Sequence, residues 1–87
     1  MKNKHQLRSE IRQFVLNDLL LGDTASMLDD DESFLETGTI DSSSVLEVVM
    51  FLEHNFQLTV QDRELVPENL DSVNRLVQFV MRKKHAA

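Results

Sequence analysis

Three segments of the chain carry apolar residues at helical spacing, and this pattern limits the fold more than any other feature of the sequence. The segments span about residues 4–21, 42–56 and 72–83. The first segment should end at Gly22, because glycine tolerates the left-handed backbone that ends many helices. The expected core stripes are Leu7, Ile11, Phe14, Val15 and Leu19 in the first segment, and Val73, Leu76, Val77 and Val80 in the last.

The connections between these segments complete the expected architecture. Residues 22–41 form a long loop rich in turn-forming residues. We expect five apolar residues to hold this loop on the core: Met27, Leu28, Phe34, Leu35 and Ile40. Within residues 57–71 we expect a short helical turn near 61–65, which Pro67 ends. A turn over 68–71 follows, and Asp71 or Ser72 caps the last helix. The sequence therefore predicts an all-α four-helix bundle, with three main helices and a short third one, as a single domain over residues 1–87.

Composition and charge exclude several classes of function. The net charge of −6 argues against nucleic-acid binding, which needs a basic surface. The chain has no cysteine, so it has no disulfide and no thiolate metal site, which fits a cytoplasmic protein. The acidic run from Asp29 does not match a calcium-binding loop, because Phe34 and Ile40 stand where that loop needs glycine and glutamate. We expect no metal and no membrane partner, since no stretch approaches the roughly 18 apolar residues of a membrane span.

The middle segment carries more apolar residues than one buried helix face can use. The residues within an arc of roughly 100°, predicted to face the core, are Val45, Val48, Val49, Leu52 and Phe56. Another side carries Leu46, Glu47, Met50, Glu53 and His54. Two interpretations stay open for its apolar residues: the loop or the short third helix covers them, or they form a partner-docking surface whose acids orient the partner. Phe51, also outside the core arc, favours the first interpretation.

An aspartate and three serines stand where the loop meets the middle helix. Ser44 and Glu47 fit a capping box, and Asp41 is an equal candidate for the cap. A helix N-terminus has unpaired N–H groups and the positive end of the dipole, so it also suits a phosphate ester. Nucleophilic catalysis is not indicated, because there is no Gly-x-Ser-x-Gly motif and His54 would lie about 18 Å along the helix from Ser42.

The run Gly38-Thr39-Ile40-Asp41-Ser42, followed by an apolar and acidic helix, resembles the acyl carrier protein and peptidyl carrier protein family. The resemblance continues through the 67–71 turn into the last helix and covers nearly the whole chain. It implies that Ser42 is esterified by 4′-phosphopantetheine, which a phosphopantetheinyl transferase takes from coenzyme A. The thiol of this arm then holds an acyl or aminoacyl group as a thioester. Asp41 matches the acid of the family motif.

The resemblance also implies what the chain works with. The positions of the family's recognition helix are Leu46, Glu47, Met50 and Glu53. Partners would be the transferase, an acyl- or aminoacyl-loading ligase, and a downstream acyltransferase or synthase. These enzymes would belong to fatty-acid, polyketide or nonribosomal-peptide biosynthesis. The chain itself would be a monomer and no enzyme.

Some positions depart from the family pattern. Ser43 stands where members usually have leucine or methionine, so the assignment to Ser42 rests on the register of the Asp-Ser pair. His54 stands where fatty-acid carriers often have an acid. The Gly-x-x-Asp-Ser spacing looks closer to stand-alone D-alanyl, aminoacyl or polyketide-type carriers. The alternative function is an unmodified helical adaptor that uses the middle helix as its docking surface.

Overall fold

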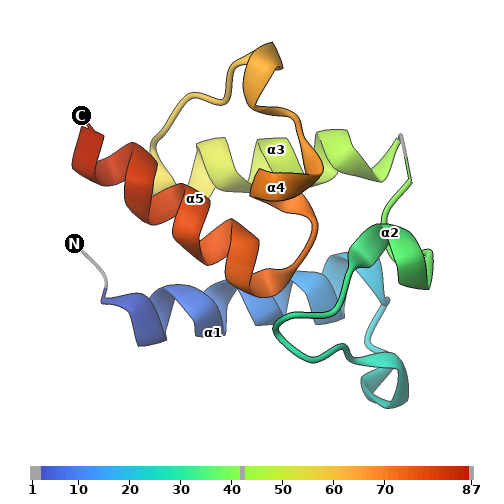
Figure 1. The fold of residues 1–87 in the computed structure, drawn as a ribbon. Coiled ribbons are helices and arrows are strands. Elements are labelled where there is room, and N and C mark those ends of the chain that lie inside the picture. Colours follow the sequence, from blue (N-terminus) through green and yellow to red (C-terminus); the bar gives the residue numbers. More distant parts are fainter. Residues whose placement is uncertain (1–2, 42, 87) are drawn as a thin grey trace.

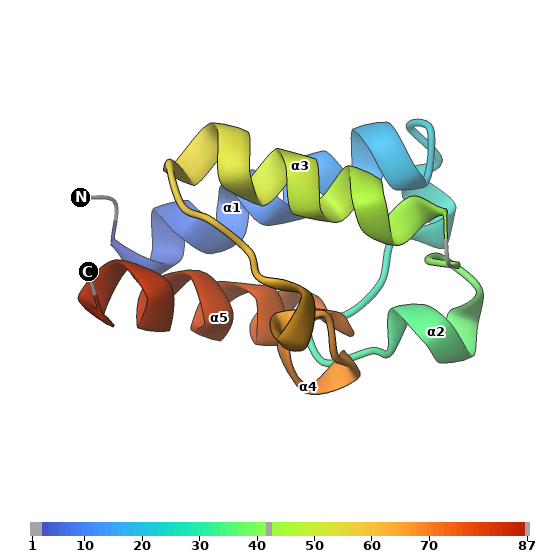
Figure 2. The same ribbon diagram turned by 90° about the horizontal axis from the view of Figure 1, so that it is seen from above.

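Three long helices form the body of the molecule, in a computed structural model that describes residues 3–41 and 43–86. They are α1 (Lys4–Phe14), which continues into the π-helical turn η1 (Val15–Leu19), α3 (Ser44–Phe56) and α5 (Val73–Ala86). Helices α1 and α3 run in opposite directions, and α5 packs beside them (Figures 1 and 2). No strand occurs in the described part of the chain. The predicted all-α bundle of the acyl carrier type is therefore confirmed.

Four short elements lie in the connections. They are η2 (Thr24–Ser26), α2 (Phe34–Thr37), η3 (Asp62–Glu64) and α4 (Pro67–Leu70). The 3₁₀ turn η3 lies where a short helical turn was expected. The expected role of Pro67 was wrong, since it begins α4 instead of ending a helix. Proline suits the first helical position because its missing N–H would have no partner there and its φ is already helical. Most of the predicted 68–71 turn is consequently helical.

The ends of the long helices are held by side chains close in sequence. Asn3 and Gln6 form a capping box at the start of α1. Ser72, one of two candidates for the cap of α5, accepts a hydrogen bond from the Arg75 N–H through its hydroxyl oxygen at 3.1 Å. The first helical segment ends at Leu19, two residues before the expected end at about residue 21, and Leu21 already adopts a left-handed backbone with φ 53°.

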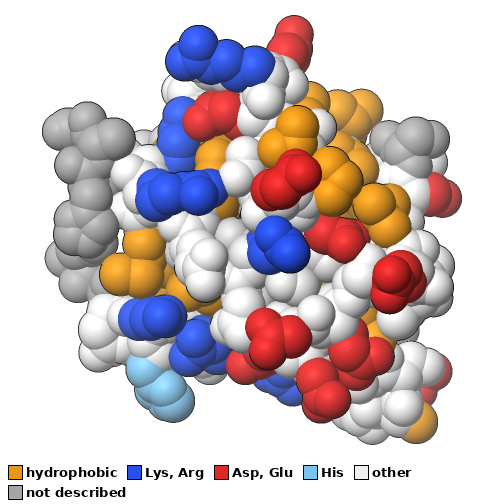
Figure 3. All heavy atoms as spheres, in the orientation of Figure 1, with side chains coloured by type: hydrophobic (Ala, Val, Ile, Leu, Met, Phe, Trp, Pro, Cys, Tyr) orange, Lys and Arg blue, Asp and Glu red, His pale blue; other side chains and the backbone are white. Residues whose placement is uncertain are grey.

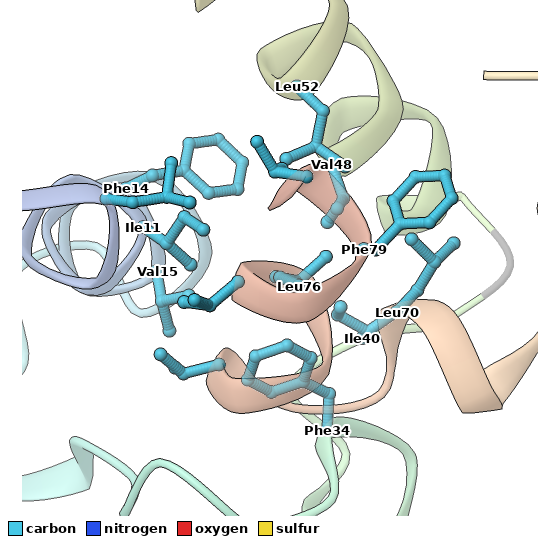
Figure 4. Packing of buried hydrophobic residues seen from close by; sticks show 14 of the residues in the cluster. Ile11, Phe14, Val15, Phe34, Ile40, Val48, Leu52, Leu70, Leu76 and Phe79 are labelled. Atoms are coloured by element: carbon cyan, nitrogen blue, oxygen red, sulfur yellow. The ribbon is translucent and has the colours of Figure 1, made fainter. Parts of the chain in front are cut away.

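The core lies between the three long helices and is closed by the long loop. The buried apolar residues include every predicted member of the last stripe and four of the first: Leu7, Ile11, Phe14, Val15, Leu28, Phe34, Ile40, Val48, Leu52, Phe56, Leu70, Val73, Leu76, Val77, Phe79 and Val80. Figure 4 shows these side chains converging from α1, α3 and α5, with Phe34 and Ile40 contributed by the loop. Leu19, Val45 and Val49, also predicted for the core, are half-buried because they lie at its margin. Phe79, which the predicted stripe omitted, is 2% exposed.

The loop between residues 22 and 41 is fixed to the bundle, as its apolar residues predicted. Leu28, Phe34 and Ile40 are buried, and Met27 packs against the core. Leu35 was expected to join them, but it is 52% exposed. The reason is the short helix α2, which turns Phe34 inward and its neighbour Leu35 outward.

Polar contacts hold the same loop from both sides. The Asp30 carboxylate accepts a hydrogen bond from Arg12 and pairs with Arg8 at 3.4 Å. Its backbone oxygen accepts from the N–H of Asn74 at 2.9 Å. Asp71 accepts hydrogen bonds from the Ser33 hydroxyl and from the Leu35 N–H. The loop is therefore tied to α1 and to the start of α5.

Candidate functional site

The turn that begins α3 is organised by the carboxylate of Asp41. Its Oδ1 atom accepts hydrogen bonds from the backbone N–H groups of Ser43 and Ser44, both at 3.0 Å. The hydroxyl groups of the same two serines donate to this oxygen at 3.0 and 3.2 Å. Asp41 therefore caps the helix through its side chain, whereas no capping bond joins Ser44 and Glu47 among the described contacts. Of the two predicted alternatives, the structure selects Asp41.

These hydrogen bonds also set the charge of the turn. They lower the pKa of Asp41 below its ordinary value of 3.8, with the Ser44 N–H as the largest cause, followed by the Ser43 and Ser44 hydroxyls. Each donor is oriented toward the ionised carboxylate and stabilises it relative to the protonated form. Asp41 is thus a carboxylate at neutral pH, placed on the surface at the positive end of the α3 dipole.

Ser42, the predicted attachment residue, lies outside the described residues. Its two neighbours, Asp41 and Ser43, are both exposed. The turn therefore lies on the protein surface at the start of a thirteen-residue helix, where a bulky phosphate ester attached between them would meet solvent. The surroundings of the position fit such a group.

The residues predicted for docking are spread over the solvent side of α3. Leu46 is 62% exposed, Met50 is 68% exposed, and Glu47 is exposed between them. Neither the loop nor the short helices cover the two apolar side chains. Phe51 is covered, as expected, because its ring stacks on Phe14 with centroids 4.1 Å apart.

Glu53 differs from the other predicted docking residues. It is half-buried, and its carboxylate accepts a hydrogen bond from the Val60 N–H at 2.8 Å. This contact holds the chain that leaves α3 against the helix. The structure therefore brings Leu46, Glu47 and Met50 together on an open face and places Glu53 at its edge.

A cavity of about 200 Å³ opens next to the turn. Its walls come from several elements and include Leu35, Ile40, Val45, Leu65, Val66 and Pro67. Hydrophobic side chains gather in the upper right of Figure 3, over α3 and the segment around α4. Sequence reasoning missed the contributions of Leu35, Leu65 and Val66, because they lie in short turns without a helical period. The signal available in the sequence was the pair of adjacent apolar residues at 65 and 66, directly before Pro67.

Charge is distributed unevenly over the surface. In Figure 3 the lysine and arginine side chains lie mainly on the left, and the acidic side chains lie mainly on the right and below. In the described part of the chain, no helix is long and apolar enough to cross a membrane, and no group of three or more side chains is arranged to hold a metal ion.

The chain was compared with known proteins. The family model described as "Phosphopantetheine attachment site" matches residues 18–80. The chain belongs to this family. It is therefore a carrier protein that bears a covalent 4′-phosphopantetheine, as the resemblance implied, and not an enzyme. A carrier of this kind works with a transferase and with ligases.

Individual relatives have similar length to this chain. The chain is 29% identical over 80 residues to a D-alanyl carrier protein of Streptococcus suis (strain 98HAH33), with 88% of the chain and 99% of the relative covered. It is 24% identical over 80 residues to the D-alanyl carrier protein of Streptococcus mutans, with 92% and 98% covered. It is 25% identical over 72 residues to that of Streptococcus gordonii, with 83% and 89% covered. The similarity thus extends over nearly the whole length of these carriers.

Proposed function

We propose that this chain is a stand-alone aminoacyl or acyl carrier whose phosphopantetheine arm is attached to Ser42. The single observation that supports this site is the surface turn in which Asp41, the residue before Ser42 in the sequence, caps α3. The family model covers the position, and its description is that of an attachment site. In this function residues 1–87 act as one carrier domain, in the cytoplasm and as a monomer.

The cargo we propose is an aminoacyl group held as a thioester, and D-alanine is the first candidate. The support is that the carriers reported above are named D-alanyl carrier proteins and match most of this chain. The thiol at the end of the arm exchanges cargo between enzymes, and its tether raises the local concentration of the cargo at each of them. A loading ligase supplies the aminoacyl group, and a downstream acyltransferase or synthase receives it.

The open face of α3 is the docking surface in this proposal. Leu46 and Met50 provide apolar contact area, and Glu47 provides charge that orients a basic partner. Methionine adapts to differently shaped partner surfaces, which suits a carrier that must visit several enzymes. We assign Glu53 a part at the edge of this surface, where it also keeps the following loop in place.

The decisive experiment is intact-protein mass spectrometry. The purified chain is incubated with coenzyme A and a broad-specificity phosphopantetheinyl transferase, with Ser42→Ala as the matched variant. We expect the mass of one phosphopantetheine to be added to the wild type and none to the variant, whose helical circular dichroism should be unchanged. Addition to both proteins would move the site to Ser43 or Ser44. Addition to neither, while a control carrier is modified, would favour the adaptor function.

A loading assay tests the cargo. The modified protein is incubated with ATP, D-alanine and a D-alanine ligase that acts on D-alanyl carrier proteins, and thioester formation is followed by mass. We expect a hydroxylamine-sensitive gain of one alanyl group. Loading by an acyl-transferring enzyme with fatty acyl substrates, and not by this ligase, would contradict the aminoacyl assignment.

A further inference from the structure

The end of the first helix contains a leucine in a backbone conformation that favours glycine. Leu21 has φ 53°, and the N–H of Gly22 donates to the Leu16 carbonyl at 2.8 Å. At a common type of helix end, the N–H that follows the left-handed residue donates to a carbonyl five residues earlier, and the left-handed residue is usually glycine. Here the corresponding bond joins residues six apart, after the wider π-helical turn η1. Here the glycine comes one residue later, and the position that most needs it holds a β-carbon.

The folded chain shows no packing that offsets this strain. The Leu21 side chain is 86% exposed and is the most exposed large hydrophobic residue in the described part of the chain. The two preceding residues, Leu19 and Leu20, pack against the core, so the segment is anchored to the bundle without the Leu21 side chain. A residue that breaks a local rule without a structural gain is a candidate for a role outside its own chain.

The position of Leu21 indicates where its partner would approach. The end of η1 lies at the same end of the bundle as the start of α3, because α1 and α3 run in opposite directions (Figures 1 and 2). Asp18 and Asp23 stand on either side of it in sequence, and both are exposed. A complementary surface would therefore have an apolar socket with basic side chains at its rim.

We propose that Leu21 is a docking residue for the phosphopantetheinyl transferase that modifies this chain. This inference rests on the function proposed above. The transferase is the partner whose active site must receive the serine oxygen itself, so its contact surface has to surround the start of α3. A specific interface buries roughly 800 Å² per partner, which is about one-seventh of the 5445 Å² that this protein exposes. Enzymes that act on the thiol reach it at the end of the arm, so their chemistry does not require contact on every side of the start of α3.

The substitution Leu21→Gly distinguishes a loss of docking from a loss of folding, because it should weaken docking while it raises the stability of the fold. The substitution removes the apolar side chain and relieves the backbone at the same time. We expect the melting temperature to rise, while the KM for this carrier in the transferase reaction increases at least threefold with little change in kcat. The assay uses coenzyme A and the broad-specificity transferase. Leu21→Met, which keeps an apolar side chain, should retain a KM close to that of the wild type.

Gln57 provides the matched control. It is exposed, has φ 48° and ends α3 at the opposite end of the bundle. Gln57→Gly relieves the same kind of strain without touching the proposed surface, so its KM should stay unchanged. A wild-type KM for Leu21→Gly would overturn the inference while leaving the proposed function intact, and so would an equal rise in KM for both glycine variants. Failure of the wild type to be modified at all would overturn the proposed function and this inference together.

Discussion

Two aspartates of the loop over residues 22–41 serve the fold in different ways: Asp30 lies near its middle and Asp41 at its end. Asp30 is half-buried and is held by Arg8 and Arg12 from α1, the latter eighteen residues away in sequence. Asp41 is exposed, and its hydrogen-bond partners are the two serines within three residues of it. One acid connects distant elements, and the other organises its own turn.

The difference separates the scaffold from the site. The Asp30 contacts fix the loop on α1 and on the start of α5, and Ile40 of the same loop is the last buried residue before the turn. The Asp41 contacts hold a turn that lies on the surface, directly before the proposed attachment residue in the sequence. A carrier needs both, because the attachment point must be accessible while the helix behind it stays in place.

Truncation of Phe34 should have the largest effect on this comparison. Phe34 is fully buried and anchors the loop in the core. We expect Phe34→Ala to lower the free energy of unfolding by about 3–4 kcal/mol, as is usual for a buried phenylalanine. Urea denaturation measures this loss. The neighbouring Leu35→Ala is the control and should change stability little, since Leu35 is 52% exposed. Equal losses would show that the loop is not part of the core.

Removal of the Asp30 carboxylate should have an intermediate effect. We expect Asp30→Ala to lower the free energy of unfolding by about 1–2 kcal/mol, because two arginines lose a partner in a half-buried setting. This loss should shrink as NaCl is added, since salt screens the attraction between Asp30 and the two arginines in the wild type. Asp29→Ala removes the same charge from an exposed neighbour and should be close to neutral. If both variants behave alike, the contacts with Arg8 and Arg12 do not stabilise the loop.

The smallest effect is expected from the titration of Asp41. Its folded-state pKa lies below the ordinary value of 3.8, so its ionised form stabilises the fold. This contribution is fully present above the ordinary value and is lost as the pH falls through the lower, folded-state pKa. Asp41→Asn keeps a capping oxygen but does not titrate. We expect urea midpoints measured from pH 6 to pH 2 to fall less steeply for the variant than for the wild type. Parallel curves would contradict the assigned cause of the pKa shift.

Much of the helical scaffold was predictable because its determinants are local. Helical spacing predicted the core stripes of α1 and α5, and the Asp-Ser pair at the loop-to-helix junction indicated the family. Asp41 could be recognised as one of two candidate caps because the cap is also local: all the groups involved lie within four residues. Pro67 was misjudged because proline both ends and begins helices, and the flanking residues do not distinguish the two.

The arrangement around the candidate site was decided by contacts between distant residues. Sequence placed Leu46 and Met50 outside the core arc of α3, but only the packed structure shows that neither the loop nor the short helices cover them. Glu53 looked equivalent to Glu47 until the fold placed the Val60 N–H beside it.

The long helices, most of their buried faces, the carrier family and two candidate caps for the turn, Asp41 among them, follow from patterns within short stretches of sequence. Packing between distant segments settles which acids are structural and which apolar residues stay open, and the structure shows that Leu21 rather than Gly22 first adopts the left-handed backbone. The two kinds of determinant differ in range. Helical periodicity and capping act over a few residues, whereas burial and ion pairing depend on which distant segments the fold brings together.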